Sequence, residues 1–121
     1  MAVNEPGFRR MTSWELEIMQ KLMEPDFPGR DILRQQLKSA TVKTIDENSS
    51  LGIKCNTAEK AVVQKTVPTE GEYQDSDGIS VHILLHVMNG EIRELEIYKD
   101  DGTAISELAK PAELKVLILD S

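Results

Sequence analysis

The 121-residue sequence predicts an α+β fold in which an N-terminal helical hairpin packs on a mostly antiparallel sheet of about five or six strands. Two changes along the chain support this prediction. Apolar residues recur at helical spacing as far as about residue 39, and at every second position from about residue 41. The charge changes at the same point, because residues 1–43 carry seven Lys/Arg and six Asp/Glu. That part has a net charge of +1. The whole chain has a net charge of −7, so residues 44–121 carry −8.

The composition predicts one folded domain. Hydrophobic residues make up 40% of the chain and charged residues 29%, which is typical of a globular protein and not of a disordered one. We expect a flexible tail over residues 1–10 and a single α+β domain over residues 11–121. At this length the chain needs neither a metal ion nor a disulfide to fold.

Charge and hydropathy exclude several classes of function. A net charge of −7 disfavours binding to nucleic acid, which requires clustered Lys and Arg. No stretch reaches the roughly 18 apolar residues of a membrane-spanning helix, and the N-terminus lacks the apolar run of a secretion signal. The single Cys55 cannot form an internal disulfide. We therefore expect a soluble, cytoplasmic protein with neither a membrane nor a nucleic-acid partner.

The first helix has clear start and stop signals. Thr12 and Glu15 have the spacing of a capping box, and Met11 precedes the cap where a hydrophobic staple would pack. Pro25 ends the helix within about one residue. Its wide apolar face comprises Trp14, Leu16, Ile18, Met19, Leu22 and Met23.

A second helix follows a short turn over residues 26–29. Pro28 suits the first turn of this helix, and its apolar positions are Ile32, Leu33 and Leu37. The helix is expected to end near Ser39. The two helices would form the helical hairpin.

The period then changes to that of strands. Val42–Ile45 and Leu51–Cys55 flank a turn-forming segment and are predicted to form a hairpin. Ala61–Val67 also has the pattern of a strand, and Glu70–Gln74 would continue it beyond Pro68, which marks an edge, a bend or a strand end. Residues 75–78 are predicted to be a turn.

The strongest strand signal is Ile79–Val87, which is apolar at every odd position, followed after Asn89-Gly90 by Glu91–Lys99. A two-residue turn would place Leu95 and Ile97 on the face opposite the odd-numbered aliphatics. A three-residue loop over residues 88–90 instead pairs position 83 with 95 and position 81 with 97. We prefer the three-residue loop, with Gly90 in the left-handed position, because burial favours the register that gathers the aliphatic residues on one face.

The C-terminal part is less regular. Residues 100–102 are predicted to turn, and Ala104-Ile105 would return as a short strand. Pro111 would break any helix around Ser106–Lys110. Leu114–Leu119 is a continuous apolar run that fits either a buried last strand or a short helix.

Polar residues of the long hairpin are the candidate site for chemistry. The preferred register places His82 opposite Glu96 and Leu84 opposite Glu94, with His86 and Tyr98 on the same face. A histidine beside a carboxylate is suited to acid–base catalysis, but it is also an ordinary cross-strand pair, and we favour the structural interpretation.

No metal, cofactor or catalytic signature emerges from the sequence. On a strand His82 and His86 lie roughly 13 Å apart, too far for one zinc ion, so no metal site is expected. A calcium loop counted from Asp75 would need Glu at its twelfth position, where the chain has His86. Cys55 alternates with Leu51 and Ile53, which indicates a buried thiol and not a nucleophile.

Acidic residues form the most coherent candidate for partner binding. They lie in the stretch before the long hairpin and on the hairpin itself, and comprise Glu70, Glu72, Asp75, Asp77, Glu91, Glu94 and Glu96. Such a set is either a solvated surface that keeps the protein soluble or an anionic surface for a basic protein, whose approach it would accelerate.

Two blocks of the sequence carry a resemblance to a known family. Residues 24–31, followed by Leu33 and Leu37, form the first block, and residues 77–87 with 95–102 form the second. Together they resemble a family of small bacterial proteins of unknown function, over about residues 11–105. The resemblance implies an α+β domain of bacterial origin and brings no family active site. As a small acidic α+β protein, the chain also resembles immunity proteins, which neutralise toxins by binding them.

These observations leave three hypotheses for function. The first is a protein-binding module, of which an immunity-type inhibitor is one form, that binds a basic partner through Glu70, Glu72, Asp75, Asp77, Glu94 and Glu96. The second is a small-molecule-binding or enzymatic domain that uses His82, His86, Glu94 and Glu96. The third is an oligomerisation domain that self-associates through Leu84, Tyr98 or an exposed edge strand.

Overall fold

The computed structural model describes residues 7–56 and 59–119, and it confirms the α+β fold. Two α-helices precede the sheet: α1 (Ser13–Leu22) and α2 (Arg30–Leu37). The strands are β1 (Thr41–Thr44), β2 (Leu51–Lys54), β3 (Thr69–Gln74), β4 (Ser80–Met88), β5 (Glu91–Lys99) and β6 (Lys115–Ile118). A 3₁₀ turn, η1 (Pro111–Glu113), precedes β6.

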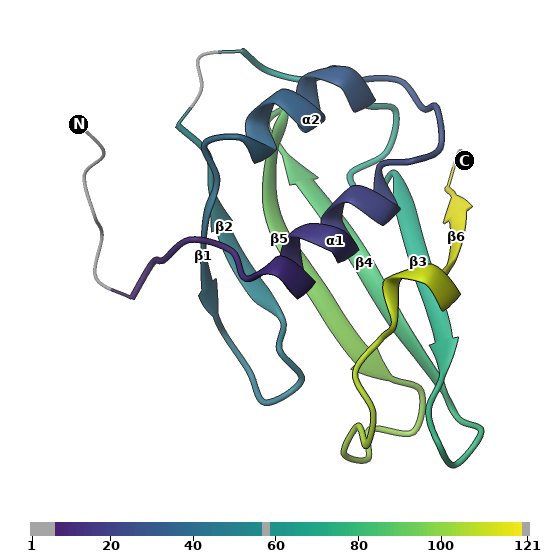
Figure 1. Ribbon diagram of the computed structural model, residues 1–121. Coiled ribbons are helices and arrows are strands. Elements are labelled where there is room, and N and C mark those ends of the chain that lie inside the picture. The colour runs from purple at the N-terminus through teal and green to yellow at the C-terminus, as the bar shows by residue number, and fades with distance from the viewer. Residues whose placement is uncertain (1–6, 57–58, 120–121) are drawn as a thin grey trace.

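The six strands form one open antiparallel sheet in the order β1-β2-β5-β4-β3-β6. Both helices and η1 lie on the same side of this sheet (Figure 1). Among the described residues the opposite side carries no helix, and we call it the helix-free face. The two long central strands, β4 and β5, therefore separate a packed side from an open side.

The capping box at the start of α1 is present as predicted. The Thr12 hydroxyl accepts a hydrogen bond from the Glu15 N–H at 3.2 Å, and the Glu15 carboxylate accepts one from the Thr12 N–H at 2.8 Å. The Arg9 guanidinium also donates to this carboxylate, and the Arg9 backbone pairs with Val42. Residues 1–6 of the predicted tail lie outside the described residues, whereas Arg9 is attached to the sheet.

The core lies between the helices and the sheet, as the odd-numbered aliphatics predict. Side chains along β4 alternate between buried and half-buried, so that every second one faces the helices. Trp14 packs against the edge of this core and donates its indole N–H to the Ala109 carbonyl at 2.7 Å. The buried residues include Ile18, Met19, Leu22, Met23, Leu33, Val81, Ile83, Leu85, Val87, Ile92, Leu95 and Ile97.

The turn of the long hairpin differs from the predicted three-residue loop. Met88 pairs with Glu91, so the connection is the two-residue turn Asn89-Gly90, and both turn residues have positive φ, at 53° and 76°. Asn and Gly suit this conformation, whose twist matches that of the strands. The predicted loop is therefore wrong, although Gly90 does occupy a left-handed position.

A β-bulge gathers the aliphatic residues on one face despite this turn. The register shifts between His86 and Val87, which pair with Glu94 and Ile92, so that Arg93 is the extra residue. Beyond the bulge Leu85 pairs with Leu95, and Ile83 pairs with Ile97. The predicted segregation of faces is thus correct, but the partners differ from those predicted by two positions.

A buried side chain from α2 fixes this turn and bulge. The Gln36 amide donates to the Gly90 carbonyl at 2.8 Å, and its oxygen accepts from the Ile92 N–H at 3.0 Å. Gln36 is fully buried, so these bonds form out of contact with water. They connect the packed helix layer directly to the irregular part of the hairpin.

The remaining strand predictions are partly confirmed. The β1–β2 hairpin and β3 are present, but Ala61–Val67 and Ala104-Ile105 contain no strand. Ala61–Val67 instead follows the sheet through single backbone bonds, one from the Ala61 N–H to the Gly90 carbonyl and one from the Val87 N–H to the Thr66 carbonyl. Most of the segment is poorly buried, since Ala61 is buried but Val62 is 84% exposed and residues 64–66 are exposed.

The last apolar run is an edge strand. β6 pairs with β3, and its residues are half-buried or exposed, whereas the preceding Leu114 is buried. Leu114 packs directly over Gly71 of β3, where a Cβ atom would lie 2.8 Å from the leucine side chain. The run is therefore a strand, but not the buried one among the alternatives. No helix among the described residues is long and apolar enough to cross a membrane.

Candidate functional site on the helix-free face

Four glutamates and two histidines lie on the helix-free face. The alternation of β3, β4 and β5 directs every second side chain away from the helices. The side chains so placed include Glu70, Glu72, His82, Leu84, His86, Glu94, Glu96 and Tyr98. The prediction that the polar residues of the hairpin share one face is confirmed.

The bulge changes which of these residues are neighbours. His82 lies opposite Tyr98 and not opposite Glu96 as the preferred register predicted, and Leu84 lies opposite Glu96. His86 lies opposite Glu94. The prediction of a His82–Glu96 pair is therefore wrong, because it was built on a three-residue loop without a bulge.

His82 is held between two carboxylates. Its Nδ1 lies 3.3 Å from Glu70 Oε2, and its Nε2 lies 2.7 Å from Asp100 Oδ1. Its ring stacks on that of Tyr98, with centroids 5.0 Å apart. Desolvation opposes protonation of the imidazole, but hydrogen bonds to Glu70 and Asp100 outweigh it, so the pKa of His82 is raised above its ordinary value.

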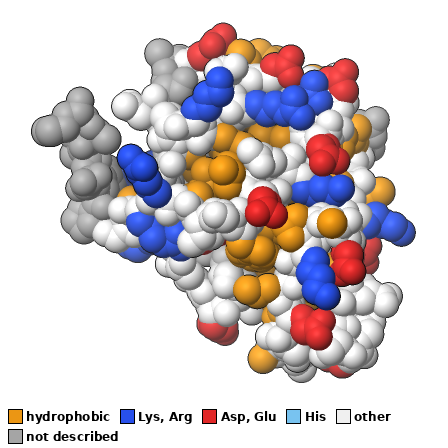
Figure 2. Space-filling view, in the orientation of Figure 1, with side chains coloured by type: hydrophobic (Ala, Val, Ile, Leu, Met, Phe, Trp, Pro, Cys, Tyr) orange, Lys and Arg blue, Asp and Glu red, His pale blue; other side chains and the backbone are white. Residues whose placement is uncertain are grey.

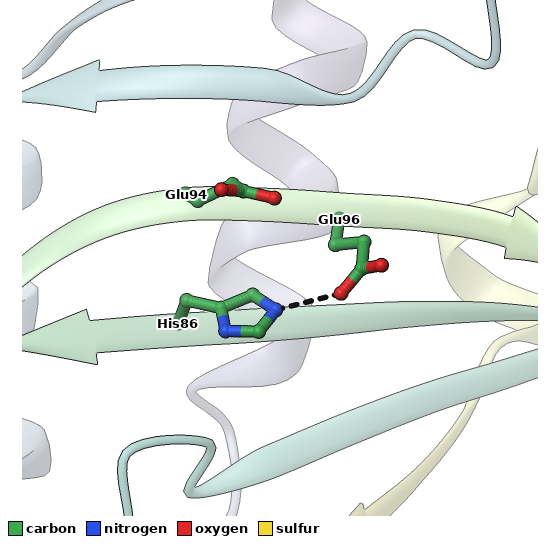
Figure 3. Close-up of side chains that lie close together, drawn as sticks. All are labelled: His86, Glu94 and Glu96. Atoms are coloured by element: carbon green, nitrogen blue, oxygen red, sulfur yellow. Dashed lines mark hydrogen bonds and ion pairs between the residues drawn. The ribbon is translucent and has the colours of Figure 1, made fainter. Parts of the chain in front are cut away.

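His86 forms a second cluster with carboxylates of the neighbouring strand. Its Nε2 lies 2.8 Å from Glu96 Oε1, and Glu94 lies beside the same pair (Figure 3). One nitrogen or oxygen atom from each of these three residues lies within 4.8 Å of the other two. Their side chains are half-buried, so the cluster is open to solvent on the side away from the sheet.

Two residues of the predicted acidic set, Asp75 and Asp77, are paired with Lys99. The Asp75 carboxylate is fully buried, and the Lys99 ammonium donates to it at 2.9 Å and to Asp77 at 2.7 Å. Asp75 also accepts backbone N–H bonds from Ser106 at 2.8 Å and Glu107 at 3.0 Å. Asp75 is thus a structural carboxylate that attaches the C-terminal segment to the sheet.

This network shifts the pKa values of its members. Hydrogen bonds from the Ser106 N–H and from Lys99 lower the pKa of Asp75 far below its usual range. Hydrogen bonds to Asp77 and Asp75 raise the pKa of Lys99 to about 12. Both groups therefore remain charged near neutral pH, and neither is suited to transfer protons there.

Cys55 lies directly after β2 and is half-buried, whereas its alternation with Leu51 and Ile53 predicted a buried residue. Burial raises its pKa to about 11, so it is protonated at neutral pH and is a weak nucleophile. It lines a surface hollow of about 370 Å³ together with Phe8, Gly52, Ile53, Lys54, Glu91 and Arg93.

The helix side of the molecule has a different surface. Apolar side chains appear there between scattered charges of both signs (Figure 2). A groove of about 590 Å³ is lined by Met11, Leu16, Gln20, Glu24, Arg34, Leu37 and Lys38, residues of α1, α2 and their flanks. In contrast to the helix-free face, this groove combines apolar lining with a mixed-charge rim.

Sequence reasoning missed one member of the His82 cluster. Asp100 was assigned only to a turn, yet it continues the even-numbered series of Glu94, Glu96 and Tyr98 by one more step. That parity was the available signal. The Arg9–Glu15 pair had no such signal, because the chain between them turns before the helix begins.

The fold and the site define a class: a small α+β domain that packs two helices on one face of an antiparallel sheet and leaves acidic side chains and histidines on the other. The chain belongs to a family described as a domain of unknown function, DUF6984, whose model matches residues 8–109. The match ends before η1 and β6. Neither the curated proteins nor the solved structures compared with the chain include a match.

Proposed function

We propose that this chain is a protein-binding module that takes a basic protein partner on its helix-free face, in the manner of an immunity-type inhibitor. The observation that carries the proposal is the gathering of Glu70, Glu72, Glu94 and Glu96 on one side of the sheet that no helix covers. A predominantly acidic surface accelerates the encounter with a basic partner and disfavours acidic ones.

The distribution of charge supports the choice of a basic partner. Among the outward-facing residues of β3, β4 and β5 are Glu70, Glu72, Glu91, Glu94 and Glu96, against one basic residue, Arg93 at the bulge. Asp100 extends the negative charge at the end of β5. Lys99, on the same strand, faces the other side and is neutralised by Asp75 and Asp77.

The centre of this surface also suits a protein partner. Leu84 is half-buried between Glu70 and Glu96 on the neighbouring strands, and the nearby Tyr98 is 37% exposed. Interfaces commonly place an aromatic or aliphatic anchor within a polar rim, since the anchor gains most from being desolvated. The acidic residues would supply the rim, and Tyr98 would supply the anchor.

The test compares two variants of equal charge. The first replaces the face carboxylates, with Glu70→Gln, Glu72→Gln, Glu94→Gln and Glu96→Gln. The matched control replaces four exposed carboxylates elsewhere, with Glu17→Gln, Glu24→Gln, Asp31→Asn and Glu47→Gln. Each protein is immobilised at low salt and exposed to an extract of its source cells. Captured proteins are identified, purified and titrated against all three chains.

A basic protein that binds the wild type and the control, but binds the face variant at least about tenfold more weakly, is the expected result. Its affinity for the wild type should fall as ionic strength rises, because exposed charges are screened. Equal affinity for the face variant and the control, or a failure to capture any basic protein, would contradict the proposal.

A further inference from the structure

We infer that His86, Glu94 and Glu96 bind one divalent transition-metal ion of the zinc type on the helix-free face. The three residues come from adjacent strands, and their side chains meet above the sheet (Figure 3). One ligand atom from each lies within 4.8 Å of the other two, and this is the only such group among residues 7–56 and 59–119.

The β-bulge creates this convergence. Because Arg93 is the extra residue, His86 lies opposite Glu94, and Glu96 follows two residues later on the same face. With the same two-residue turn and no bulge, His86 would lie opposite Arg93, and Glu94 would point into the core beside Leu85. The irregularity that aligns the apolar residues thus also places two carboxylates beside one imidazole.

The distances suit a single ion after a small adjustment. Zinc binds imidazole nitrogen and carboxylate oxygen at about 2.0–2.2 Å, so two ligand atoms on one ion lie at most about 4.3 Å apart. His86 Nε2 and Glu96 Oε1 are already 2.8 Å apart. The Glu96 side chain is 41% exposed, so side-chain rotation alone can bring the carboxylates into place.

The ligand set selects the class of metal. One imidazole with two carboxylates suits Zn²⁺ and neighbouring transition metals, whereas Mg²⁺ and Ca²⁺ prefer oxygen ligands throughout. Two ionised carboxylates and a neutral imidazole would balance the charge of a divalent ion. Three protein ligands leave a fourth tetrahedral position for water.

The other histidine on the same face provides a contrast. His82 also contacts two carboxylates, but Glu70 lies at its Nδ1 and Asp100 at its Nε2. These carboxylates are on opposite sides of the ring, so all three residues cannot direct a ligand atom at one ion. His82 therefore serves as a matched control: it is a histidine of the same strand as His86 and contacts two carboxylates, but these do not converge on one ion.

The test is a titration of the full chain with zinc chloride in the absence of any partner. Calorimetry measures binding, and the imidazole NMR signals of both histidines show which residue is involved. The wild type should bind one zinc ion, with the His86 signals changing and those of His82 unaffected. His86→Gln should weaken binding at least about tenfold, because losing an outer-sphere partner alone typically costs 10–100-fold. His82→Gln should bind zinc as the wild type does.

Glu94→Gln provides a second variant in case His86→Gln does not fold, and should also weaken binding. A tenfold excess of magnesium chloride should not displace the zinc. The inference is overturned if the wild type binds no zinc at about 1 mM, or if His86→Gln or Glu94→Gln binds as tightly as the wild type. It is overturned equally if His82→Gln is as impaired as His86→Gln. Because no partner is present, these results do not depend on the proposed protein-binding function.

Discussion

His82 shows how much a single side chain on an open sheet face is constrained by its neighbours. Its two ring nitrogens contact carboxylates of β3 and of the segment after β5, and its ring stacks on Tyr98. Protonation gives the imidazole two N–H donors, one for each carboxylate. The charged form is therefore favoured in the folded chain, although desolvation opposes it.

This arrangement predicts a pH-dependent stability. The pKa of His82 is higher in the folded chain than in the unfolded one, so its contribution is fully present below the ordinary histidine pKa of about 6.5 and is lost as the pH rises through the higher folded value. The difference in melting temperature between the wild type and His82→Gln should be larger at pH 5.5 than at pH 8.5. Thermal unfolding followed by circular dichroism measures it, and a difference that grows with pH would contradict this assignment.

At the level of the secondary-structure element, the bulge in β5 reconciles two requirements that a regular hairpin cannot meet. The two-residue turn places Ile92 opposite Val87 in the core, whereas Leu95 and Ile97 must also reach the core from odd-numbered positions. One extra residue between them changes the parity. Gln36 then stabilises the irregular segment through the Ile92 N–H and the Gly90 carbonyl.

Deleting residues from β5 tests this explanation. Deletion of Arg93 should be tolerated, with a loss of less than about 2 kcal/mol in the free energy of unfolding, because Ile92 and Leu95 then alternate regularly and keep their partners. Deletion of Glu96 should abolish cooperative folding, since Ile97 moves to the solvent face and Lys99 leaves its buried carboxylate. Denaturant unfolding of both variants distinguishes these outcomes. A folded Glu96 deletion, or an unfolded Arg93 deletion, would show that the register is fixed by something other than burial.

The same hairpin shows what the sequence can predict. Periodic apolar residues report burial, so the odd positions from Val81 to Val87 and the α1 capping box at Thr12 were predicted correctly. A bulge changes only one residue, and its sole signal was the even-numbered Ile92. Ala61–Val67 has residue types that suit a strand, but it meets the sheet only through single backbone hydrogen bonds.

For the site, the sequence predicted a shared face but not the neighbours on it. Which residues share a face depends only on parity, whereas the pairing of His86 with Glu94 depends on the bulge. Asp75 was placed on the surface because turns are usually solvated. Its burial depends on Lys99 and Ser106, which are more than twenty residues away in the chain.

At the level of the whole molecule, the Asp75–Lys99 network joins three distant parts of the chain. Asp75 belongs to the turn between β3 and β4, Lys99 ends β5, and the backbone around Ser106 and Glu107 leads toward η1. The Lys99 ammonium also donates to the Ala104 carbonyl. Polar contacts therefore hold this end of the sheet together, beside the apolar residues Tyr73 and Ile105 that pack on the core.

The two members of the buried pair should differ in their effects on stability. Asp75→Ala leaves the Ser76, Ser106 and Glu107 N–H groups without their acceptor, whereas Lys99→Met leaves Asp75 with those three donors. Asp75→Ala should therefore lower the melting temperature more than Lys99→Met at pH 7. The pKa of Asp75 is lowered in the folded chain, so its stabilising effect is lost as the carboxylate becomes protonated. The difference in melting temperature between the wild type and Asp75→Ala should therefore shrink as the pH falls below about 4. An equal or larger effect of Lys99→Met in calorimetry would contradict this ranking.

The contact of Leu114 with Gly71 has an evolutionary consequence. A Cβ atom at position 71 would lie 2.8 Å from the side chain of the leucine that precedes the last strand, so any larger residue there requires Leu114 to shift. The family match ends at residue 109, which puts Gly71 inside the matched segment and Leu114 outside it. A relative with a bulkier residue in place of Gly71 should therefore carry a smaller residue in place of Leu114, or route its C-terminal segment away from β3.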